Sequence, residues 1–385
     1  MEPFDDIRPY HDDEVRPTLN RLLKDRDLLK ALAYHRYPGL TRELSGLMGW
    51  LTSIVLRRKT SHINNIRHFQ AFVEPYLRRI IKASTSGVTY SGLERLDSTK
   101  AYLFLSNHRD IVLDPALVNY ALYQSQRETC RIAIGDNLVH RPFVSDLMRL
   151  NKSFIVKRSV TGRREKLKAF QTLSGYIHHS IATGHPVWIA QSEGRAKDGN
   201  DKTDPAIIKM FNVSRRGRDQ VFAQNIKSLN IVPVSISYEF DPCDRHKSRE
   251  LHQTEHQGSY TKAKDEDMRS IVKGIEGYKG HVHVAFGQPL VGDYPDADSV
   301  ASEVDHQIWC NYQIQPINFF AWEAIADELT QSLPEFSVPS LEQLFSDIDL
   351  DAKRREFADR LKLCKPEYRK WFLRMYAYPV INRYK

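Results

Sequence analysis

Short apolar runs in the middle of the chain alternate with longer stretches of helical character. Strand-like runs occupy residues 102–105, 187–191 and 231–238, and the alternating apolar residues over 281–287 predict a further, late strand. Residues 164–183 have the length and composition of a helix. The pattern therefore predicts strands that alternate with helices, as in an α/β fold.

The segments on either side of this part of the chain have a different character. Residues 1–84 and 296–385 are mainly helical in pattern, whereas residues 85–295 carry the predicted strands. We therefore expect an α/β domain over 85–295 with a helical extension on each side. Within that domain Pro233 interrupts a strand-like run, and because proline lacks an amide donor it predicts an edge strand or a bulge.

The candidate chemistry begins directly after the first strand-like run. Asn107 and His108 are followed there by two carboxylates, Asp110 and Asp114. A histidine that is oriented by an aspartate can take a proton from an alcohol. Because the chain has no Gly-x-Ser-x-Gly elbow that would supply a nucleophile, His108 is better interpreted as a base acting on a substrate hydroxyl. This interpretation predicts group transfer onto an alcohol.

Asp114 also has a purely structural interpretation. It precedes Pro115 and an apolar run, so it can be the N-cap of a helix whose first residue is the proline. Five residues separate His108 from Asp114, and on a continuous helix this spacing places the two side chains about 120° apart. The pair can therefore meet only if the segment is a loop that turns before the helix, and Asp110 remains a rival partner for His108.

Three later segments add to this picture: the run over 231–238 that contains Pro233, and two runs that place polar groups at their ends. The run that begins at Lys152 ends in Lys157 and Arg158, which predicts an anion site there. The run over 187–191 opens into a turn-rich loop of the kind that often carries function. The candidate residues of that loop are Glu193, Gly194, Arg195 and Lys197.

The four segments, taken in order, resemble the four motifs of the glycerolipid acyltransferase family. This family includes glycerol-3-phosphate and 1-acylglycerol-3-phosphate (lysophosphatidate) acyltransferases. The resemblance covers roughly residues 85–295, and its His-Asp motif has five intervening residues where the family usually has four. The positions that carry it are His108 and Asp114, Arg158, Glu193-Gly194-Arg195, and Val232-Pro233-Val234.

The resemblance implies a mixed central sheet covered by helices. It also implies transfer of a fatty acyl group from acyl-carrier protein or acyl-CoA to a hydroxyl of glycerol-3-phosphate or 1-acylglycerol-3-phosphate, in phospholipid synthesis. His108 is then the general base and Asp114 its partner, and Arg158 and Arg195 grip the acceptor phosphate beside Glu193 and Gly194. The supporting candidates are Asn107, Asp110, Lys157 and Lys197. Because a thioester is already activated, no metal or other cofactor is expected. A non-catalytic member that only binds lipid or carrier is the alternative.

One further motif points to different chemistry. His252, Glu255 and His256 fit the His-x-x-Glu-His pattern of inverted zinc peptidases, whose histidines meet a metal on one helix face. The neighbouring residues are almost wholly polar, whereas a catalytic zinc helix needs an apolar face to support its ligands. A zinc peptidase is therefore only a remote alternative, and we expect no metal here.

Composition limits the partners and the compartment. The 385 residues, of which 41% are hydrophobic, are ample for a full core, and the net charge of +8 favours acidic partners such as anionic lipid or an acidic carrier. Nucleic acid is not expected, because no recognition module is evident. The four cysteines lack metal-ligand spacing and no secretory leader is evident, which predicts a reducing cytoplasm.

A membrane surface is the expected place of action. No apolar run of about eighteen residues predicts a spanning helix. An apolar stripe at helical spacing, with Trp50 beside it and Arg57-Arg58-Lys59 after it, predicts an interfacial helix. The stripe consists of Leu40, Leu44, Leu47, Leu51 and Ile54. Residues 368–376 mix aromatic and cationic side chains, which suits the headgroup layer. We therefore expect peripheral attachment to the inner, cytoplasmic face of the membrane.

Overall fold

The computed structural model describes the whole chain except residues 1–3, 38, 40–43, 216–220, 264–265 and 331–336. The chain divides into two compact units. The first unit consists of Met1–Arg78 and Cys130–Ile177, and the second of Arg79–Thr129 and His178–Lys385. Two helices, α5 (Ile66–Ser84) and α8 (Arg163–Ala182), begin in the first unit and end in the second.

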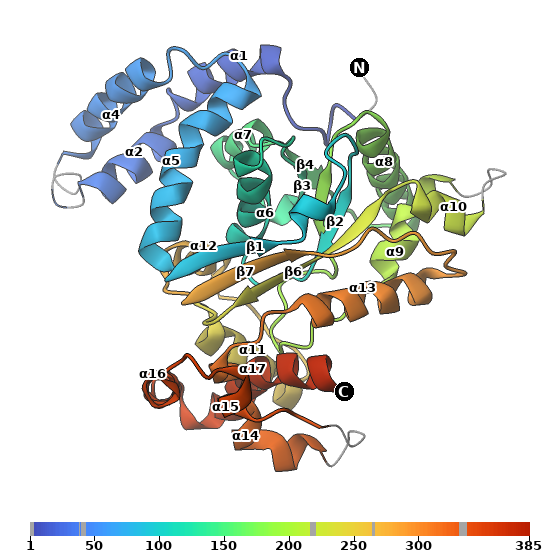
Figure 1. Ribbon diagram of the computed structural model, residues 1–385. Coiled ribbons are helices and arrows are strands. Elements are labelled where there is room, and N and C mark those ends of the chain that lie inside the picture. Colours follow the sequence, from blue (N-terminus) through green and yellow to red (C-terminus); the bar gives the residue numbers. More distant parts are fainter. Residues whose placement is uncertain (1–3, 38, 40–43, 216–220, 264–265, 331–336) are drawn as a thin grey trace. The chain divides into compact units, whose positions relative to one another are not determined.

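The second unit is built on a mixed sheet with the strand order β1-β7-β6-β2-β5 (Figure 1). The strand β6 is parallel to β2 and antiparallel to β7, while β2 is parallel to β5 and β1 to β7. All residues of β6 are buried, as expected for a central strand covered on both faces. The bounds are β1 Gly87–Ser91, β2 Leu103–Ser106, β5 Val187–Ala190, β6 Ile231–Tyr238 and β7 His281–Phe286.

The edge position predicted from Pro233 is wrong. Pro233 lies in β6 opposite Leu105 of β2, in the interior of the sheet. On its other side it faces Gly287, just beyond the last pair of the β6–β7 ladder, and its carbonyl accepts the Gly287 N–H at 2.8 Å. The missing proline donor therefore removes only one hydrogen bond, at the end of a ladder, which is why the central position is tolerated.

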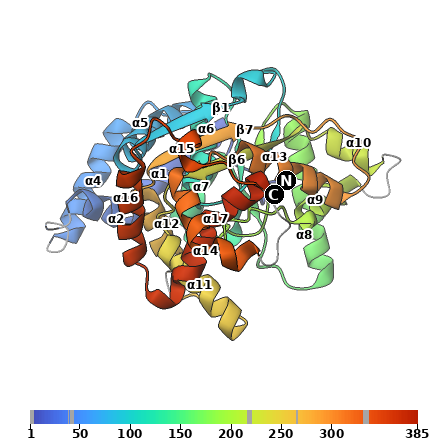
Figure 2. The same ribbon diagram turned by 60° about the horizontal axis from the view of Figure 1, so that its bottom comes forward.

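Helices surround this sheet and continue beyond it. Helix α13 packs against β6, and α17 packs against α11 and α14 in a helical group around the C-terminus (Figure 2). The helices are α6 Leu113–Gln124, α9 Pro205–Phe211, α10 Phe222–Lys227, α11 Asp244–Gln257, α12 Glu266–Glu276, α13 Ala297–Asn311, α14 Pro316–Thr330, α15 Leu341–Leu344, α16 Leu350–Lys362 and α17 Arg369–Tyr384. Single 3₁₀ turns lie at Leu93–Arg95, Val213–Arg215 and Pro366–Tyr368.

The expectation of an exposed aromatic and cationic tail is wrong. Phe372 and Tyr376 of α17 belong to a buried cluster together with Phe357 of α16, and Trp371 is also buried. Burial of such large rings against neighbouring helices is more favourable than their exposure to water. The tail is therefore a packed helix of the second unit.

The first unit combines helices with two parallel strands, β3 (Arg131–Gly135) and β4 (Ser153–Val156). Its core joins Val15 and Leu19 of α1 to Phe69 of α5. The remaining elements are α1 Asp12–Leu22, α2 Arg26–Arg36, α4 Ser45–Lys59, a 3₁₀ turn at Asp136–Leu138 and α7 Pro142–Leu150.

The predicted fold class is confirmed, because a mixed sheet is flanked by helices and extended by helices at both ends of the chain. The predicted helix over 164–183 corresponds closely to α8. The boundaries of the predicted domains, 1–84, 85–295 and 296–385, stay predictions. Among the described residues, no helix is both long enough and apolar enough to traverse a bilayer.

Candidate active site

The loop that follows β2 is attached to β6 by one amide side chain. Asn107 is fully buried, accepts the backbone N–H of Ile236 at 2.7 Å and donates to the Ile236 carbonyl at 3.0 Å. Backbone pairing between β2 and β6 ends at Ser106 and Val234, but β6 continues. The Asn107 side chain thus makes the hydrogen bonds to β6 that the β2 backbone no longer makes. These bonds fix the backbone directly before His108.

His108 and Asp114 are brought together by this loop. Asp114 Oδ2 accepts hydrogen bonds from His108 Nδ1 at 2.8 Å, from Arg109 N at 2.5 Å and from Asp110 N at 2.8 Å. Asp114 Oδ1 accepts the hydroxyl of Tyr238 at 2.8 Å. Asp114 is fully buried, so these four donors replace the water that its carboxylate has lost. An ionised carboxylate only accepts, so Nδ1 of His108 carries the hydrogen and Nε2 has the lone pair.

The five residues between His108 and Asp114 include the non-helical loop that lets the two side chains meet. Residues 107–112 are not helical, and α6 begins at Leu113 with Val112 at its N-cap position. The helix thus begins two residues earlier than the expected start at Pro115. The ring of His108 lies edge-to-face on Trp188, with 5.6 Å between the centroids. The imidazole is therefore held by both a hydrogen bond and a ring contact.

Asp110, the rival partner, has the capping role that was one interpretation of Asp114. Its Oδ1 accepts the backbone N–H groups of Val112 at 2.9 Å and Leu113 at 2.8 Å, at the start of α6. Burial and the nearby Asp114 carboxylate raise the pKa of Asp110. Its Oδ2 points at Gly274 of α12, where an added Cβ would lie only 1.9 Å away. The structure therefore places Asp110 at the helix start rather than on His108.

The loop after β5 lies against the His108 loop. The Ala196 N–H donates to the His108 carbonyl at 2.7 Å. Gly194 has φ +79, a conformation that favours glycine, and Glu193 is exposed. The Nη1 atom of Arg195 is shielded from solvent and has no hydrogen-bond partner among the described residues. This guanidinium therefore retains a donor for a ligand anion.

Lys197, in the same loop, is not a free cation. Its ammonium pairs with Glu250 of α11 at 2.9 Å, and its side chain is about one third exposed. It fits the supporting role better than a role in binding a phosphate, because its charge is already partly neutralised.

A buried ion pair beneath the His108 loop was not predicted from the sequence. Arg109 and Asp201 are each about 5% exposed and are joined by a 2.5 Å contact between Nη2 and Oδ2. Asn107 donates to the same Asp201 oxygen at 3.1 Å. Lys247 of α11 donates to the Arg109 carbonyl at 2.9 Å and also pairs with Asp241. The site is thus supported by residues far apart in the sequence, and no local pattern identifies them.

Lys157 and Arg158 belong to the first unit. Lys157 forms an ion pair with Asp6. The backbone N–H of Arg158 donates to Asp136 at 3.2 Å, and its side chain packs beside Gly135, where an added Cβ would lie 3.2 Å from Nε. The participation of Arg158 and Arg195 in one phosphate site stays a prediction.

The histidines of the zinc-peptidase motif have packing roles in the second unit. The rings of His252 and His256 are stacked at 4.2 Å, and both lie edge-on to Trp371 of α17. Glu255 accepts the indole N–H of Trp371 at 2.7 Å. Across the part of the chain that the structure describes, no group of three or more His, Cys, Asp or Glu side chains is placed to hold a metal ion.

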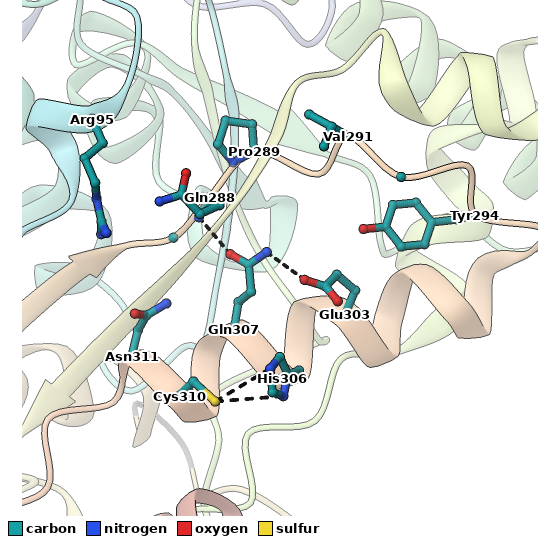
Figure 3. Close-up of a pocket in the computed structure, with 12 residues that line it drawn as sticks. Arg95, Gln288, Pro289, Val291, Tyr294, Glu303, His306, Gln307, Cys310 and Asn311 are labelled. Carbon is teal, nitrogen blue, oxygen red and sulfur yellow. Dashed lines mark hydrogen bonds between the residues drawn. The ribbon is translucent and has the colours of Figure 1, made fainter.

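A separate pocket of about 410 Å³ lies between α13 and the loop after β7 (Figure 3). Its lining includes Arg95, His306, Gln307 and Cys310. The Gly287 N–H at this loop bonds to Pro233, near the beginning of β6. His108 follows β2, which is parallel to β6, so the pocket lies at the opposite end of these strands from His108.

Part of the chain is similar to known proteins. Residues 87–237 match the family described as Acyltransferase, and the four motifs all lie within this range. No curated protein matches the chain. A similar solved structure is the 1-acyl-sn-glycerophosphate (LPA) acyltransferase PlsC from Thermotoga maritima, with 14% identity, a TM-score of 0.36, and coverage of 81% of this chain and 100% of that chain. The family match supports the resemblance carried by the motifs, because residues 87–237 match an acyltransferase domain.

Proposed function

We propose that this acyltransferase moves a fatty acyl group from a thioester to a hydroxyl of glycerol-3-phosphate or 1-acylglycerol-3-phosphate, as a step of phospholipid synthesis. The observation that carries the proposal is the His108–Asp114 pair, in which Nδ1 is engaged at 2.8 Å. Nε2 has no hydrogen bond among the described residues, and the side chain is 14% exposed. It can therefore reach a substrate hydroxyl while the ring stays fixed.

The reaction requires one proton transfer and one exchange of bonds. The acceptor hydroxyl gives its proton to His108 Nε2 as its oxygen attacks the thioester carbonyl. The C–O bond forms, the C–S bond breaks, and the departing thiolate takes up the proton from the imidazolium. Asp114 holds the ring in orientation and stabilises the charged intermediate state of His108. The proposed reaction uses no cofactor besides the acyl donor, which is acyl-carrier protein or acyl-CoA.

The experiment that tests the function is direct. Purified protein is incubated with acyl-carrier protein and with acyl-CoA donors, against glycerol-3-phosphate, 1-acylglycerol-3-phosphate and unphosphorylated glycerol and monoacylglycerol. Products are identified by mass spectrometry, and thiol release is measured in parallel. The proposal expects an ester of a phosphorylated acceptor. Binding of lipid or donor without ester formation or thiol release would instead support the non-catalytic alternative.

Arg195 is proposed to bind the acceptor phosphate, with Arg158 as a further candidate and Glu193 and Gly194 shaping the loop. The shielded Nη1 of Arg195 can donate to a phosphate oxygen, and the guanidinium has a planar geometry that lysine lacks. We expect Arg195→Lys to raise the acceptor KM about tenfold and the donor KM much less. Lys197→Arg is the matched control. Equal weakening toward phosphorylated and unphosphorylated acceptors would contradict this role.

The proposed membrane contact is the outer face of the hairpin formed by α2 and α4 in the first unit. These helices pack together. The hydroxyl of Ser53 in α4 also donates to the carbonyl of Leu23, at the end of α1, at 2.9 Å. The apolar side chains left exposed on α2 and α4 are Leu32, Tyr34, Leu47, Trp50, Leu51 and Val55. Of the predicted stripe, Leu40 lies outside the described residues and Ile54 is half-buried. The helix α4 ends in three cations, which suits an anionic surface.

We expect the double variant Leu47→Ser/Trp50→Ser to lose at least tenfold in affinity for anionic vesicles, because each large apolar side chain that enters a membrane contributes about 1.5–3 kcal/mol. Co-sedimentation with neutral and anionic vesicles measures it, and high salt should weaken binding to the anionic ones. Val291→Ser, at the exposed Val291 of the second unit, is the control. Unchanged binding of the double variant would remove the hairpin from the proposed attachment to the cytoplasmic face.

A further inference from the structure

We propose that Tyr238 is a positioning residue that fixes the carboxylate of Asp114 and, through it, the imidazole of His108. The kinetic part of this inference rests on the proposed function. Tyr238 is the last residue of β6 and is 5% exposed, and its hydroxyl donates to Asp114 Oδ1 at 2.8 Å.

The two oxygens of Asp114 are held by different parts of the chain. Oδ2 receives all of its donors from the His108 loop: the imidazole N–H and the backbone N–H groups of Arg109 and Asp110. On Oδ1, within the described residues, Tyr238 supplies the hydrogen bond. The terminal torsion of an aspartate is soft, so a donor on the second oxygen that comes from another part of the chain further narrows the rotation of the carboxylate. The hydrogen bond to Oδ1 therefore helps to hold the Oδ2 lone pair that meets His108.

The position of Tyr238 follows from the extension of β6 past the end of β2. Asn107 pairs with Ile236 on this extension, and Tyr238 lies two residues further along, on the same face of the strand. The strand thus carries a hydroxyl from the sheet to the carboxylate, independently of the loop. The pair of His108 and Asp114 is consequently connected to β6 at two places, through Asn107 and through Tyr238.

The electrostatic surroundings favour a neutral donor at this position. Burial, together with the charges of Asp114, Asp110 and Asp241, raises the pKa of Tyr238 well above its usual value. The phenol therefore stays protonated at neutral pH and can donate its hydrogen bond. A buried hydroxyl without a partner is unfavourable, and the Asp114 carboxylate supplies that partner.

A tyrosine that only fills space would have the same ring and no need of its hydroxyl. Tyr238→Phe removes that hydroxyl and keeps the ring. Tyr90 of β1 offers a matched control, because its hydroxyl is buried and has no hydrogen-bond partner among the described residues. Tyr90→Phe therefore deletes the same atom from a neighbouring part of the same sheet without touching Asp114.

The test combines kinetics with the NMR spectrum of His108. We expect Tyr238→Phe to lower kcat about 3- to 10-fold, with both KM values within about twofold, since one hydrogen bond to the carboxylate is lost. In ¹⁵N-histidine-labelled full-length protein, the Nδ1–H resonance assigned to His108 should move in Tyr238→Phe and stay in place in Tyr90→Phe. In an Asp114→Asn background, Tyr238→Phe should have no further effect on kcat.

The outcomes separate this inference from the proposed function. An unchanged kcat and an unmoved His108 resonance in Tyr238→Phe overturn the positioning role while His108→Ala still tests the function. If the wild-type protein transfers no acyl group, the function fails, and the resonance alone decides the role of Tyr238. Should Tyr238→Phe not fold, 3-fluorotyrosine incorporated at position 238 keeps the hydroxyl and changes its acidity. A His108 resonance that does not respond to the fluorine then overturns the inference.

Discussion

Replacement of His108 by alanine is expected to lower the rate of acyl transfer about 10²- to 10⁴-fold, which is the usual contribution of a general base. The fold should survive, because the loop that carries the imidazole is held independently of it by Asn107 and by the Ala196 amide. The measurement is the initial rate at saturating donor and acceptor, with thermal unfolding as the check of folding.

Two additions make this experiment decisive. His185→Ala is a matched control, because His185 is a 40% exposed histidine of the same unit that precedes β5, at the opposite end of that strand from the loop that carries Arg195. Added imidazole should restore part of the activity of His108→Ala and none of the small losses in the control. A variant that keeps activity within about threefold of the wild type would remove His108 from the mechanism.

The same assay separates the two carboxylates of the loop. Asparagine at position 110 can still accept the two N–H groups at the start of α6, so Asp110→Asn should cost little activity. Asparagine at position 114 removes the charge that stabilises the imidazolium, so Asp114→Asn should lose on the order of 10²-fold or more. If Asp110→Asn loses more than Asp114→Asn at equal stability, the partner has been assigned to the wrong residue.

The parts of the fold that were predictable depend on neighbours in the sequence. The run 102–105 became β2, and the helix over 164–183 became α8, because apolar periodicity acts over a few residues. Pro233 was misplaced because the consequence of its missing donor depends on where β7 ends, more than fifty residues later. The aromatic tail was misplaced for a similar reason, since its partners are α11, α14 and α16.

The site shows the same division. The motif spacing identified His108 and two candidate carboxylates, but only the loop geometry decides which one meets the imidazole. Tyr238 reaches Asp114 across 124 positions, and Arg109 reaches Asp201 across 92. Pairs of this kind have no local pattern, because the sheet brings them together. Arg109, which is buried beside His108, is therefore easily mistaken for a surface charge when only the sequence is read.

The largest effect on stability is expected at the Arg109–Asp201 pair. Arg109→Met leaves the carboxylate of Asp201 buried without its cation, and breaking a buried pair in this way typically costs about 3–5 kcal/mol in the free energy of unfolding. Replacing Asp201 at the same time should remove most of that cost. Asp201→Asn is the suitable second substitution, because asparagine can still accept the hydrogen bond from Asn107 and tolerates the positive φ of position 201.

The cost should depend on pH in a defined direction. Burial raises the pKa of Asp201 and Arg109 opposes that rise, so in Arg109→Met the carboxyl is still more reluctant to ionise. A carboxyl with a raised pKa in the folded state binds more protons there than in the unfolded chain, so stability falls as the pH rises above its unfolded value, near 4. Urea unfolding should therefore show a larger deficit for Arg109→Met at pH 8 than at pH 5. In Arg109→Met/Asp201→Asn this pH dependence should vanish. If the loss of unfolding free energy in Arg109→Met is equal at both pH values, lost packing rather than an unpaired charge causes the destabilisation.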